Sequence, residues 1–513
     1  MTDYSAAQER VFAFLTDPVS HPAVTRIDTH AASVFLEGGR ALKIKRAVRF
    51  PFLDYSTLEK RKSACEEEIR INRPFAPQVY HRVVAITESR DGSLEVGGDG
   101  TPIEYAVEMS RFDESRTLDR LANAGPFGID LAIGIADAIS ASHAVAPRVD
   151  AIPWIEAIPS LIDGNTEALQ RSGDFATAEI RELAGAAHGA FARLRSLLEE
   201  RGRQGFVRRC HGDLHLANIV LIDEQPVLFD AIEFDPKIAS TDILYDLAFT
   251  LMDLLHYEQS QAANILFNRY LATTPVENLD ALGVLPMFMS IRAGIRAEVL
   301  LAKLKGPHSD QAEIVKDATA YFCLAQALLA RALIAPPVPR VIAIGGLSGT
   351  GKSVLARMLA PAILPQPGAV VLRSDIVRKQ LFQVKDTDRL PPSAYQPDIT
   401  GRVYETLAQR ARRVLAQGHS VIIDAVFAQE SERHAVAALA RECDVPLTGL
   451  FLVADLATRQ VRVGSRQNDA SDATKEVAAL QDRYNIGDVG WTIIDASGTP
   501  EQTLGQTRIA IDR

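Results

Sequence analysis

The chain has 513 residues, 47% hydrophobic and 23% charged, which is the balance of a globular protein too long for one hydrophobic core. Its net charge of -10 argues against a nucleic acid as the main partner and favours small molecules; it indicates no oligomeric state. The four cysteines form no CxxC pair, and there is no signal-like start and no apolar run of about 18 residues, so we expect a cytoplasmic protein without zinc knuckle, disulfide framework or membrane span.

The first 110 residues contain clustered short strands. In ALKIKR, Lys43 and Lys45 are two apart and therefore share one face of a predicted strand, and the predicted helix CEEEIRIN carries Glu66, Glu67 and Glu68. A strand lysine held by a helical glutamate is how a kinase contacts the α- and β-phosphates of ATP. We favour Lys43 and Glu68. Lys45 stays open as the contact, and a solvated charged patch is the alternative for the glutamates.

The strand EYAVEMSRF at 104–112 is predicted to form an interlobe hinge whose backbone around 108–110 binds adenine. A GxGxxG loop is missing, and the equivalent turn is THAAS at 29–33, where His30 and Ser33 could contact phosphate. After the first 110 residues, the sequence is mostly helical up to residue 335. We therefore predict a β-rich lobe on a helical lobe.

The stretch HGDLHLAN places Asp213 and Asn218 five residues apart. This is the spacing of the HRDxxxxN loop, in which Asp takes the proton of the attacking hydroxyl and Asn binds metal. Asp230 follows an apolar run in VLFDAIEFD, where a further magnesium ligand is expected.

HGDLHLANIVL, LFDAIEFDP and TDILYDLAF together resemble the aminoglycoside and choline kinase branch of the kinase-like fold. The resemblance implies a small-molecule substrate, Asp213 as catalytic base, Asn218 and Asp230 as magnesium ligands, and Asp246 as a buttress of the catalytic loop. For a cationic aminoglycoside substrate, the candidate acidic contacts are Glu233 and Asp235.

The prolines of APPVPR at 335–340 bias the chain toward extended geometry and predict a domain boundary there. Beyond it, apolar runs such as VIAIGG and HSVIIDAVF alternate with helical segments, which indicates a parallel sheet. We therefore predict an α+β bilobal protein-kinase-like domain over 1–335, followed by an α/β P-loop domain with a parallel sheet over 336–513.

Residues 346–353, GLSGTGKS, match the pattern GxxxxGK[ST] after a predicted strand and before a predicted helix. Glycines let backbone N–H groups turn toward a phosphate, Lys352 would reach the β- and γ-phosphates, and Ser353 would give its hydroxyl to Mg²⁺. The predicted nucleotide-binding residues of this loop are Gly346, Leu347, Ser348, Gly349, Thr350, Gly351, Lys352 and Ser353.

Asp375 and Asp424 each end an apolar run, and the carboxyl ends of strands in an open α/β sheet face the ligand crevice. Asp375 could act as catalytic base, with Arg378 one turn later holding an anionic substrate group. Asp424 could position Mg²⁺ through water. For each acid, the alternative is a helix N-cap.

The segment LATRQVRVGSRQNDASDAT places Arg459, Arg462 and Arg466 on a helix that runs into a polar loop. Such cations could stabilise a migrating phosphoryl group, and a solvated arginine face is the alternative. GLSGTGKS, SD, IIDA and RVGSR in this order resemble the small P-loop kinases of the nucleoside-monophosphate, shikimate, gluconate and zeta-toxin group. That resemblance implies Arg462 beside adenine, and Lys352 and Arg466, the lid arginine, in catalysis.

Both halves thus point to ATP and Mg²⁺, and the whole arrangement resembles an uncharacterised bacterial fusion family. We expect a two-domain kinase in which each domain transfers the γ-phosphoryl group of ATP to a hydroxyl of a small sugar, polyol or aminocyclitol. Two alternatives are an ATP-binding regulator that senses nucleotide without transfer, and an aminoglycoside resistance kinase.

Overall fold

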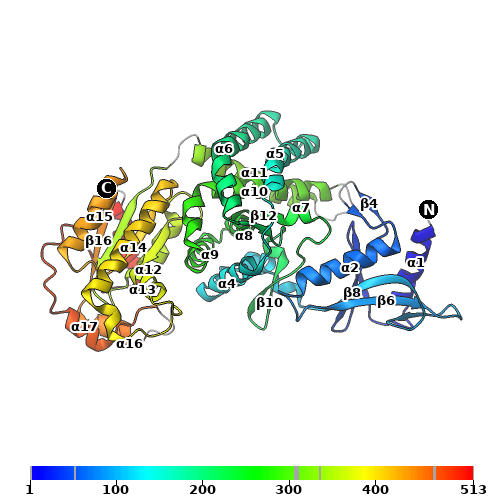
Figure 1. The fold of residues 1–513 in the computed structure, drawn as a ribbon, viewed down its shortest axis with the longest axis horizontal. Helices are drawn as coiled ribbons and strands as arrows, with labels where there is room; N and C mark the ends of the chain where they lie inside the picture. The colour runs from blue at the N-terminus through cyan, green and yellow to red at the C-terminus, as the bar shows by residue number, and fades with distance from the viewer. Residues whose placement is uncertain (1–2, 51–52, 305–310, 334–336, 466–469, 512–513) are drawn as a thin grey trace. The chain divides into compact units, whose positions relative to one another are not determined.

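A computed structural model describes residues 3–50, 53–304, 311–333, 337–465 and 470–511 of the chain (Figure 1). The contacts within it define two compact units. Unit 1 comprises Met1–Leu161 and Arg195–Tyr257, and unit 2 comprises Ile162–Leu194 and Glu258–Arg513. The boundary predicted between 335 and 336 lies outside the described residues and stays a prediction. Among the described helices, none combines the length and the apolarity that a bilayer crossing requires.

Unit 1 begins with a six-stranded sheet in which every neighbouring pair is antiparallel, in the order β1-β2-β3-β8-β6-β7. The turn between β2 and β3 is Gly38-Gly39, and Gly38 has a φ of 56°, which glycine adopts without steric cost. The strands are β1 (Thr25–Asp28), β2 (Ala32–Glu37), β3 (Arg40–Lys45), β6 (Tyr80–Glu88), β7 (Leu94–Val96) and β8 (Thr101–Ser110).

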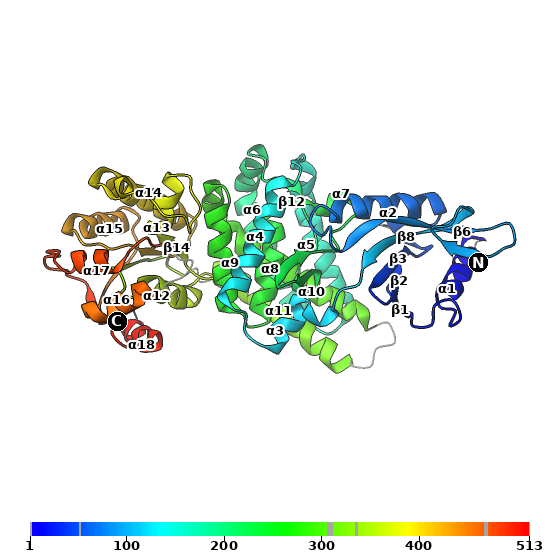
Figure 2. The ribbon, with the colours of Figure 1, turned by 90° about the horizontal axis from the view of Figure 1, so that it is seen from below.

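Helices α1 (Asp3–Leu15) and α2 (Leu58–Asn72) pack on opposite faces of this sheet (Figure 2). Side chains alternate between the faces of a strand, so Ala106 joins the apolar cluster that contains Phe12 of α1, whereas its neighbour Val107 joins the cluster that contains Cys65 of α2. The face toward α2 is also the face of Lys43 and Lys45, which brings these lysines close to the glutamates of α2.

The rest of unit 1 is mainly helical and carries two small antiparallel ribbons, β10-β11 and β9-β12. Helix α8 lies at its centre, since all residues from Ile243 to Leu254 are buried. The predicted α+β class is therefore confirmed. The elements are α3 (Leu118–Ala124), α4 (Ile129–Val145), β9 (Val207–Arg209), β10 (Ile219–Ile222), β11 (Gln225–Leu228), α7 (Pro236–Ala239), β12 (Ser240–Asp242) and α8 (Ile243–His256), with a short pair β4 (Arg49–Phe50) and β5 (Leu53–Asp54).

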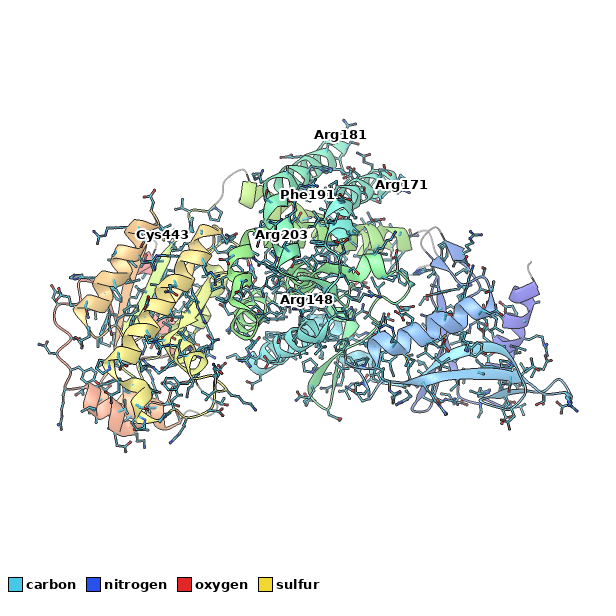
Figure 3. The ribbon with its side chains drawn as sticks, in the orientation of Figure 1. Arg148, Arg171, Arg181, Phe191, Arg203 and Cys443 are labelled. Carbon is cyan, nitrogen blue, oxygen red and sulfur yellow. The ribbon has the colours of Figure 1, made fainter. Side chains whose placement is uncertain are left out.

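Two long helices, α5 (Ile152–Ser172) and α6 (Thr177–Arg203), are joined by a short turn. Arg171 near the end of α5 and Arg181 near the start of α6 project outward from the ribbon (Figure 3). The helix ends beside the turn thus carry long charged side chains that stay in water, while the apolar stripe of each helix is buried.

Unit 2 contains a five-stranded sheet in the order β14-β15-β13-β16-β17, and all neighbouring pairs are parallel, as predicted. From β13 the chain continues to β14 on one side of the sheet, and from β15 it continues to β16 on the other side of β13. The order of the strands therefore reverses beside β13, and ligands bind at such a position in parallel α/β sheets. The strands are β13 (Val341–Gly346), β14 (Val370–Arg373), β15 (Val421–Asp424), β16 (Leu447–Val453) and β17 (Thr492–Asp495). The helices between and after them are α12 (Lys352–Leu359), α13 (Ser374–Leu381), α14 (Pro397–Ala416), α15 (Glu430–Glu442), α16 (Leu456–Gly464), α17 (Lys475–Gln481) and α18 (Pro500–Ile511).

Unit 2 also contains α9 (Ser260–Thr273), the 3-10 helix η3 (Val276–Val284), α10 (Leu285–Lys303) and α11 (Gln311–Leu333). Helix α9 covers the open edge of strand β14. Asn268 accepts a hydrogen bond from the N–H of Val371 at 2.6 Å and donates to the carbonyl of Ala369 at 3.2 Å, and Asn264 donates to Ala369 at 3.1 Å. These two amides, one helical turn apart, take the place of a neighbouring strand.

Candidate active sites

In unit 1, strand β3 and helix α2 bring Lys43 and Glu68 together. The ammonium of Lys43 lies 2.8 Å from Oε1 of Glu68 and 2.6 Å from Oδ1 of Asp230. Burial favours the protonated acid, yet the charge of Lys43 holds the pKa of Asp230 below its usual value. The side chain of Asp230 is 45% exposed, so this carboxylate is both ionised and open to a ligand.

Lys45 forms a second ion pair behind the first. Its ammonium lies 2.7 Å from Oε2 of Glu68 and also pairs with Glu233, which accepts a hydrogen bond from the hydroxyl of Tyr55 at 3.1 Å. The side chain of Lys45 is 3% exposed, whereas that of Lys43 is 16% exposed. Only Lys43 therefore offers its ammonium to the space in front of Asp230.

The other two candidate glutamates, Glu66 and Glu67, pair with neighbours on their own helix. Glu66 lies 3.5 Å from Lys62, and Glu67 lies 2.6 Å from Arg70. The predicted solvated charged patch thus describes Glu66 and Glu67 but not Glu68, whose side chain is fully buried.

The catalytic-loop candidates Asp213 and Asn218 lie in direct contact. The side-chain amide of Asn218 donates to the backbone carbonyl of Asp213 at 2.8 Å and to its Oδ2 at 3.1 Å. These bonds use the amide nitrogen, so the amide oxygen of Asn218 stays the candidate metal ligand. The Asp213 carboxylate is 41% exposed, with Nε2 of His215 at 3.4 Å. The charge of Asp213 also opposes ionisation of Asp230, which shows that the two carboxylates share one electrostatic environment.

Helix α8 binds the backbone of this loop through a stripe of polar side chains on one face of the helix. Asp246 accepts from the N–H of Gly212 at 2.8 Å, Thr250 donates to the carbonyl of Leu214 at 2.7 Å, and Asp253 accepts from the N–H of Leu216 at 2.9 Å. The three residues recur at helical spacing on an otherwise apolar helix. Sequence reasoning assigned a buttress role to Asp246 and missed the other two, although the stripe itself is visible in ILYDLAFTLMDLLH.

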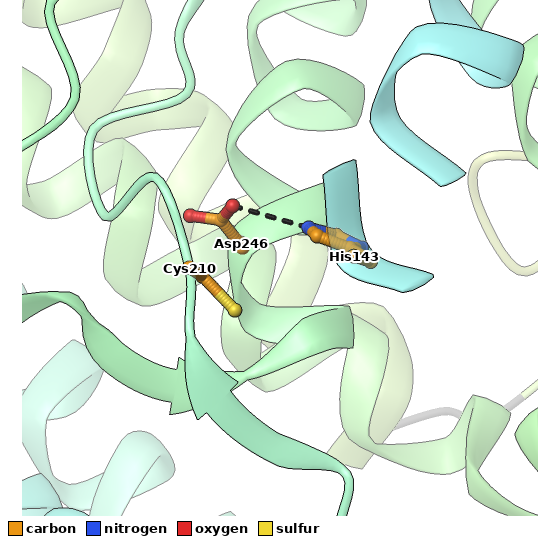
Figure 4. A group of neighbouring side chains, drawn as sticks. All are labelled: His143, Cys210 and Asp246. Atoms are coloured by element: carbon orange, nitrogen blue, oxygen red, sulfur yellow. Dashed lines mark hydrogen bonds and ion pairs between the residues drawn. The ribbon is translucent and has the colours of Figure 1, made fainter. Parts of the chain in front are cut away.

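Among the described residues, one group of His, Cys and carboxylate side chains is close enough to consider as a metal centre: the ligand atoms of His143, Cys210 and Asp246 lie within 4.8 Å of one another (Figure 4). Each already has a protein partner, because His143 and two loop amides bond to Asp246, and the thiol of Cys210 contacts the carbonyl of Thr241 at 3.6 Å. Burial raises the pKa of the Cys210 thiol, which disfavours the thiolate that a metal needs. These contacts favour a role in anchoring the loop over a role in metal binding.

The predicted hinge lies slightly earlier than the observed connection. Glu108 is still within β8, where its carboxylate pairs with Arg40 and Arg82, and the strand ends at Ser110. The connection that follows, 111–115, lines an open pocket of about 610 Å³ together with residues of β1 and β2. The assignment of adenine to the backbone around 108–110 stays a prediction. In the turn THAAS, Ser33 donates to Asp28 at 2.6 Å and is therefore already engaged.

In unit 2, GLSGTGKS forms the turn between β13 and α12, as predicted. Gly349 has a φ of 89°, and a Cβ there would lie 2.5 Å from the carbonyl oxygen of Arg459. Lys352, the first residue of α12, reaches back to the carbonyl of Leu347 at 3.3 Å. The N–H of Ser348 donates to the side chain of Gln481 in α17 at 2.7 Å, a contact that no short motif could have indicated.

The two magnesium candidates of unit 2 also meet. The hydroxyl of Ser353 donates to Oδ2 of Asp424 at 2.5 Å, and Nε of Arg373 lies 3.4 Å from the same oxygen. A hydroxyl beside a carboxylate is an oxygen-only ligand set of the kind that Mg²⁺ prefers, and the same holds for Asn218 and Asp230 in unit 1. Both sets therefore fit a magnesium ion by the chemistry of their donors.

The helix-cap alternative is wrong for both acids of unit 2. The N-cap of α13 is Arg373, so Asp375 lies in the first turn, and the N-cap of α15 is Gln429, five residues after Asp424. Burial raises the pKa of Asp375, and the nearby charges of Arg373 and Lys352 oppose that shift. A raised pKa brings a carboxylate closer to the range that suits a general base.

Arg378 is less available than expected. It is buried, donates to the carbonyl of Ala394 at 2.6 Å and lies over the ring of Tyr395, 4.8 Å from its centre. Its main contacts therefore hold the loop of residues 394 and 395 in place, and nothing in this geometry favours the predicted grip on a substrate anion.

The predicted arginine helix has three different outcomes. Arg462 lines a pocket of about 360 Å³ to which the phosphate loop contributes Gly349, Thr350, Gly351 and Ser353. Its guanidinium donates to the carbonyls of Ala496 at 2.7 Å and Gly498 at 2.8 Å. Arg459 is buried and pairs with Asp482, so the solvated-face alternative is wrong for it. Arg466 lies outside the described residues.

Residues 341–485 match the protein family described as AAA domain. An uncharacterized protein of Mycobacterium tuberculosis is 28% identical over 500 residues, which cover 94% of this chain and 95% of that protein. A choline/ethanolamine kinase family protein from Mesorhizobium loti is similar in structure over 64% of this chain and 97% of its own, with 13% identity and a TM-score of 0.37. A gluconokinase from Sinorhizobium meliloti is similar over 34% of this chain and 95% of its own, with 19% identity and a TM-score of 0.24. The family match covers the part of unit 2 that contains strands β13 to β16 of the parallel sheet.

Proposed function

We propose that the protein is a two-site ATP-dependent kinase in which each site transfers the γ-phosphoryl group to a hydroxyl of a small molecule. The observation that carries this proposal is that the two compact units each hold a lysine and a pair of oxygen ligands suited to magnesium. Two separate sets, each with intact contacts, favour two working sites over one working site and one remnant.

At the first site, Lys43 contacts the α- and β-phosphates, because it is the lysine whose ammonium is accessible and paired with Glu68. Asp213 accepts the proton of the attacking hydroxyl, and its partly exposed carboxylate is oriented through the amide of Asn218. Asn218 and Asp230 would hold Mg²⁺, which supplies charge neutralisation to the transferring phosphoryl group.

At the second site, the amides of GLSGTGKS other than that of Ser348, which is bonded to Gln481, surround the phosphates. Lys352 neutralises the charge of the phosphates. Ser353 and Asp424 would hold the magnesium ion. Asp375 accepts the proton of the acceptor hydroxyl, and the pocket that Arg462 lines receives the nucleoside. Arg466 is proposed to stabilise the transferring group as a lid arginine, on the basis of the sequence alone.

We propose a sugar, polyol or aminocyclitol as the acceptor class, with the product of one site passing to the other. The alternative of aminoglycoside phosphorylation finds no support at the two acids considered for it. Glu233 is buried against Lys45 and Tyr55, and Asp235 accepts from the N–H of Lys237 at 2.8 Å as the cap of α7. Glu233 is thus already paired with a cation, whereas the cap formed by Asp235 uses only its Oδ1.

The test is ADP release from ATP in the presence of pooled metabolites, measured for the full chain and for the variants Asp213→Asn, Lys352→Ala and the double variant. Asp213→Asn removes the proposed general base, a loss of about 10²–10⁴-fold in rate, and Lys352→Ala removes the proposed positive charge at the phosphates. The variant that disables the earlier-acting site should abolish both phosphorylated products, and the other single variant should abolish only the final product. Conversion of one product into the other should fail in only one of the single variants. Nucleotide binding without ADP release in the unmodified chain would instead indicate a regulator.

A further inference from the structure

The charged side chains around Lys43 and Lys45 in unit 1 form one continuous series of alternating charges. In order they run Asp230, Lys43, Glu68, Lys45 and Glu233, with contacts of 2.6 Å, 2.8 Å and 2.7 Å along the first three steps. This series of charges begins at the partly exposed carboxylate of Asp230 and ends at the buried carboxylate of Glu233. A single lysine and glutamate are enough for the proposed contact with phosphate. The buried pair of Lys45 and Glu233 therefore needs a separate explanation.

The inner ammonium cannot reach a nucleotide. Lys45 is surrounded by Glu68, Glu233 and the ring of Tyr55, whose centre lies 5.6 Å away. Its backbone carbonyl is held as well, since the side chain of Gln8 donates to it at 2.9 Å. Removal of this charge would leave Glu233 buried with only the hydroxyl of Tyr55, which is costly in a region of low dielectric.

Nucleotide binding changes what the outer lysine touches. Lys43 has one ammonium group, which in this structure is divided between Glu68 and Asp230. When this ammonium turns toward phosphate oxygens, its hold on Glu68 weakens, and Asp230 is released toward its oxygen-ligand role. The carboxylate of Glu68 then depends on Lys45, whose buried ammonium contacts the other oxygen of Glu68 and does not turn toward the phosphates.

We propose that Lys45 is a positioning residue of the first site, which keeps Glu68 and the segment 230–233 in place while Lys43 serves the nucleotide. Glu233 lies three residues after Asp230, so the same ammonium that fixes Glu68 also ties the metal-ligand segment to strand β3. The first site is thereby assembled by its own buried charges and needs no separate ordering of α2. This inference rests on the proposed kinase function of unit 1.

The experiment uses the full chain with the second site silenced by Lys352→Ala in every variant, and measures the Kd of Mg·ADP by titration calorimetry together with the thermal unfolding temperature. Lys45→Met alone leaves Glu233 without its ammonium and is expected to lose stability, so the double variant Lys45→Met/Glu233→Met carries the test. Replacement of a whole buried ion pair by apolar side chains of similar volume is often neutral for stability.

We expect the double variant to unfold near the temperature of the parent and to bind Mg·ADP about 10-fold more weakly, the size of effect typical of residues behind a ligand shell. Tyr55→Phe, which removes one hydrogen bond to Glu233 and no charge, serves as the matched control and should bind Mg·ADP as the parent does. A double variant with the affinity of the parent would overturn the proposal for Lys45.

Lys43→Met separates this inference from the function on which it rests. If Lys43→Met binds Mg·ADP as the parent does, the proposed nucleotide site of unit 1 is itself wrong. If Lys43→Met loses binding while the double variant keeps it, only the role of Lys45 is wrong. Loss of affinity in both, at unchanged stability of the double variant, supports both.

Discussion

The two candidate sites hold their proposed phosphate-binding groups by different physical means. In unit 1, the groups are side chains, and each is fixed by another charged or polar side chain, such as Glu68 beneath Lys43 or Asp246 beneath the loop of Asp213. In unit 2, the main groups are backbone amides, and their arrangement depends on glycines such as Gly349. The first site should therefore be sensitive to the loss of one charge, and the second to the addition of one carbon atom.

The largest effect is expected from Asp246→Asn in unit 1. The carboxylate accepts from Gly212, from His211 and from His143, and an amide can replace only part of this acceptor capacity. Loss of a buried charged acceptor costs about 3–5 kcal/mol of unfolding free energy. Denaturant unfolding of the full chain should show this loss, together with loss of the product that depends on Asp213.

Asp99→Asn, at an exposed position of unit 1, is the control for that change and should unfold as the parent does. The comparison would break if Asp246→Asn left the first site active, since the loop of Asp213 would then be held by its backbone alone.

The next effect is expected from Gly349→Ala in unit 2. A Cβ at this position would lie 2.5 Å from the carbonyl oxygen of Arg459 and 2.8 Å from its Cα, in a backbone conformation with a φ of 89°. Left-handed strain and overpacking together cost about 3 kcal/mol, or about 100-fold in affinity. Titration of Mg·ADP into the chain with the first site silenced by Lys43→Met measures this.

Gly401→Ala is the matched control, because a Cβ there meets no atom within 4 Å and the residue lies within helix α14. Weaker nucleotide binding in Gly401→Ala as well would show that the second site responds to helix stability and not to the shape of its phosphate loop.

A smaller effect is expected at the edge of the parallel sheet. Asn268→Leu would leave the N–H of Val371 and the carbonyl of Ala369 without this partner, and we expect a loss of about 2 kcal/mol in the stability of unit 2. Asn268→Asp keeps the acceptor for Val371 and removes the donor to Ala369, so its loss should be intermediate. Equal losses in the two variants would show that the side chain acts through packing and not through hydrogen bonding.

The smallest effect is a pH dependence in unit 2. Burial lowers the pKa of His419 to about 4, although its hydrogen bond to the carbonyl of Leu282 at 3.2 Å acts in the opposite direction. The unfolded chain binds a proton near pH 6.5, so stability is full above that pH and falls as the pH drops toward 4.

Between pH 7.5 and 5.5 this histidine should cost unit 2 about 1 kcal/mol. Thermal unfolding at the two pH values checks it, and His419→Asn should show a smaller difference. An unchanged pH dependence in His419→Asn would mean that other groups titrate on unfolding.

Parts of both sites could be predicted because their chemistry follows short spacings. Asp213 and Asn218 contact each other as the five-residue spacing implied, and GLSGTGKS lies between a strand and a helix as its glycines required. The choice between Lys43 and Lys45 could not be made from the sequence. Residues two apart on a strand point to the same face, and only the depth of each ammonium in the folded unit distinguishes them.

Other features depend on contacts between residues far apart in the chain. The amide of Ser348 is bonded by Gln481, and the edge of β14 is covered by Asn264 and Asn268, about 100 residues earlier in the sequence. Neither contact can be predicted from the neighbouring sequence, because the sequence around a helical asparagine does not indicate whether its side chain faces water or the edge of a strand.

The sequence alone determined the secondary structure, the parallel order of the second half and the chemical types gathered at each site, because backbone geometry and side-chain periodicity are local. The tertiary structure decided which lysine keeps a partly exposed ammonium, which acids are already paired with buried partners, and which helices pack against the parallel sheet. These outcomes depend on burial and on the pairing of distant charges, and the free energy of both is set only when the chain is folded.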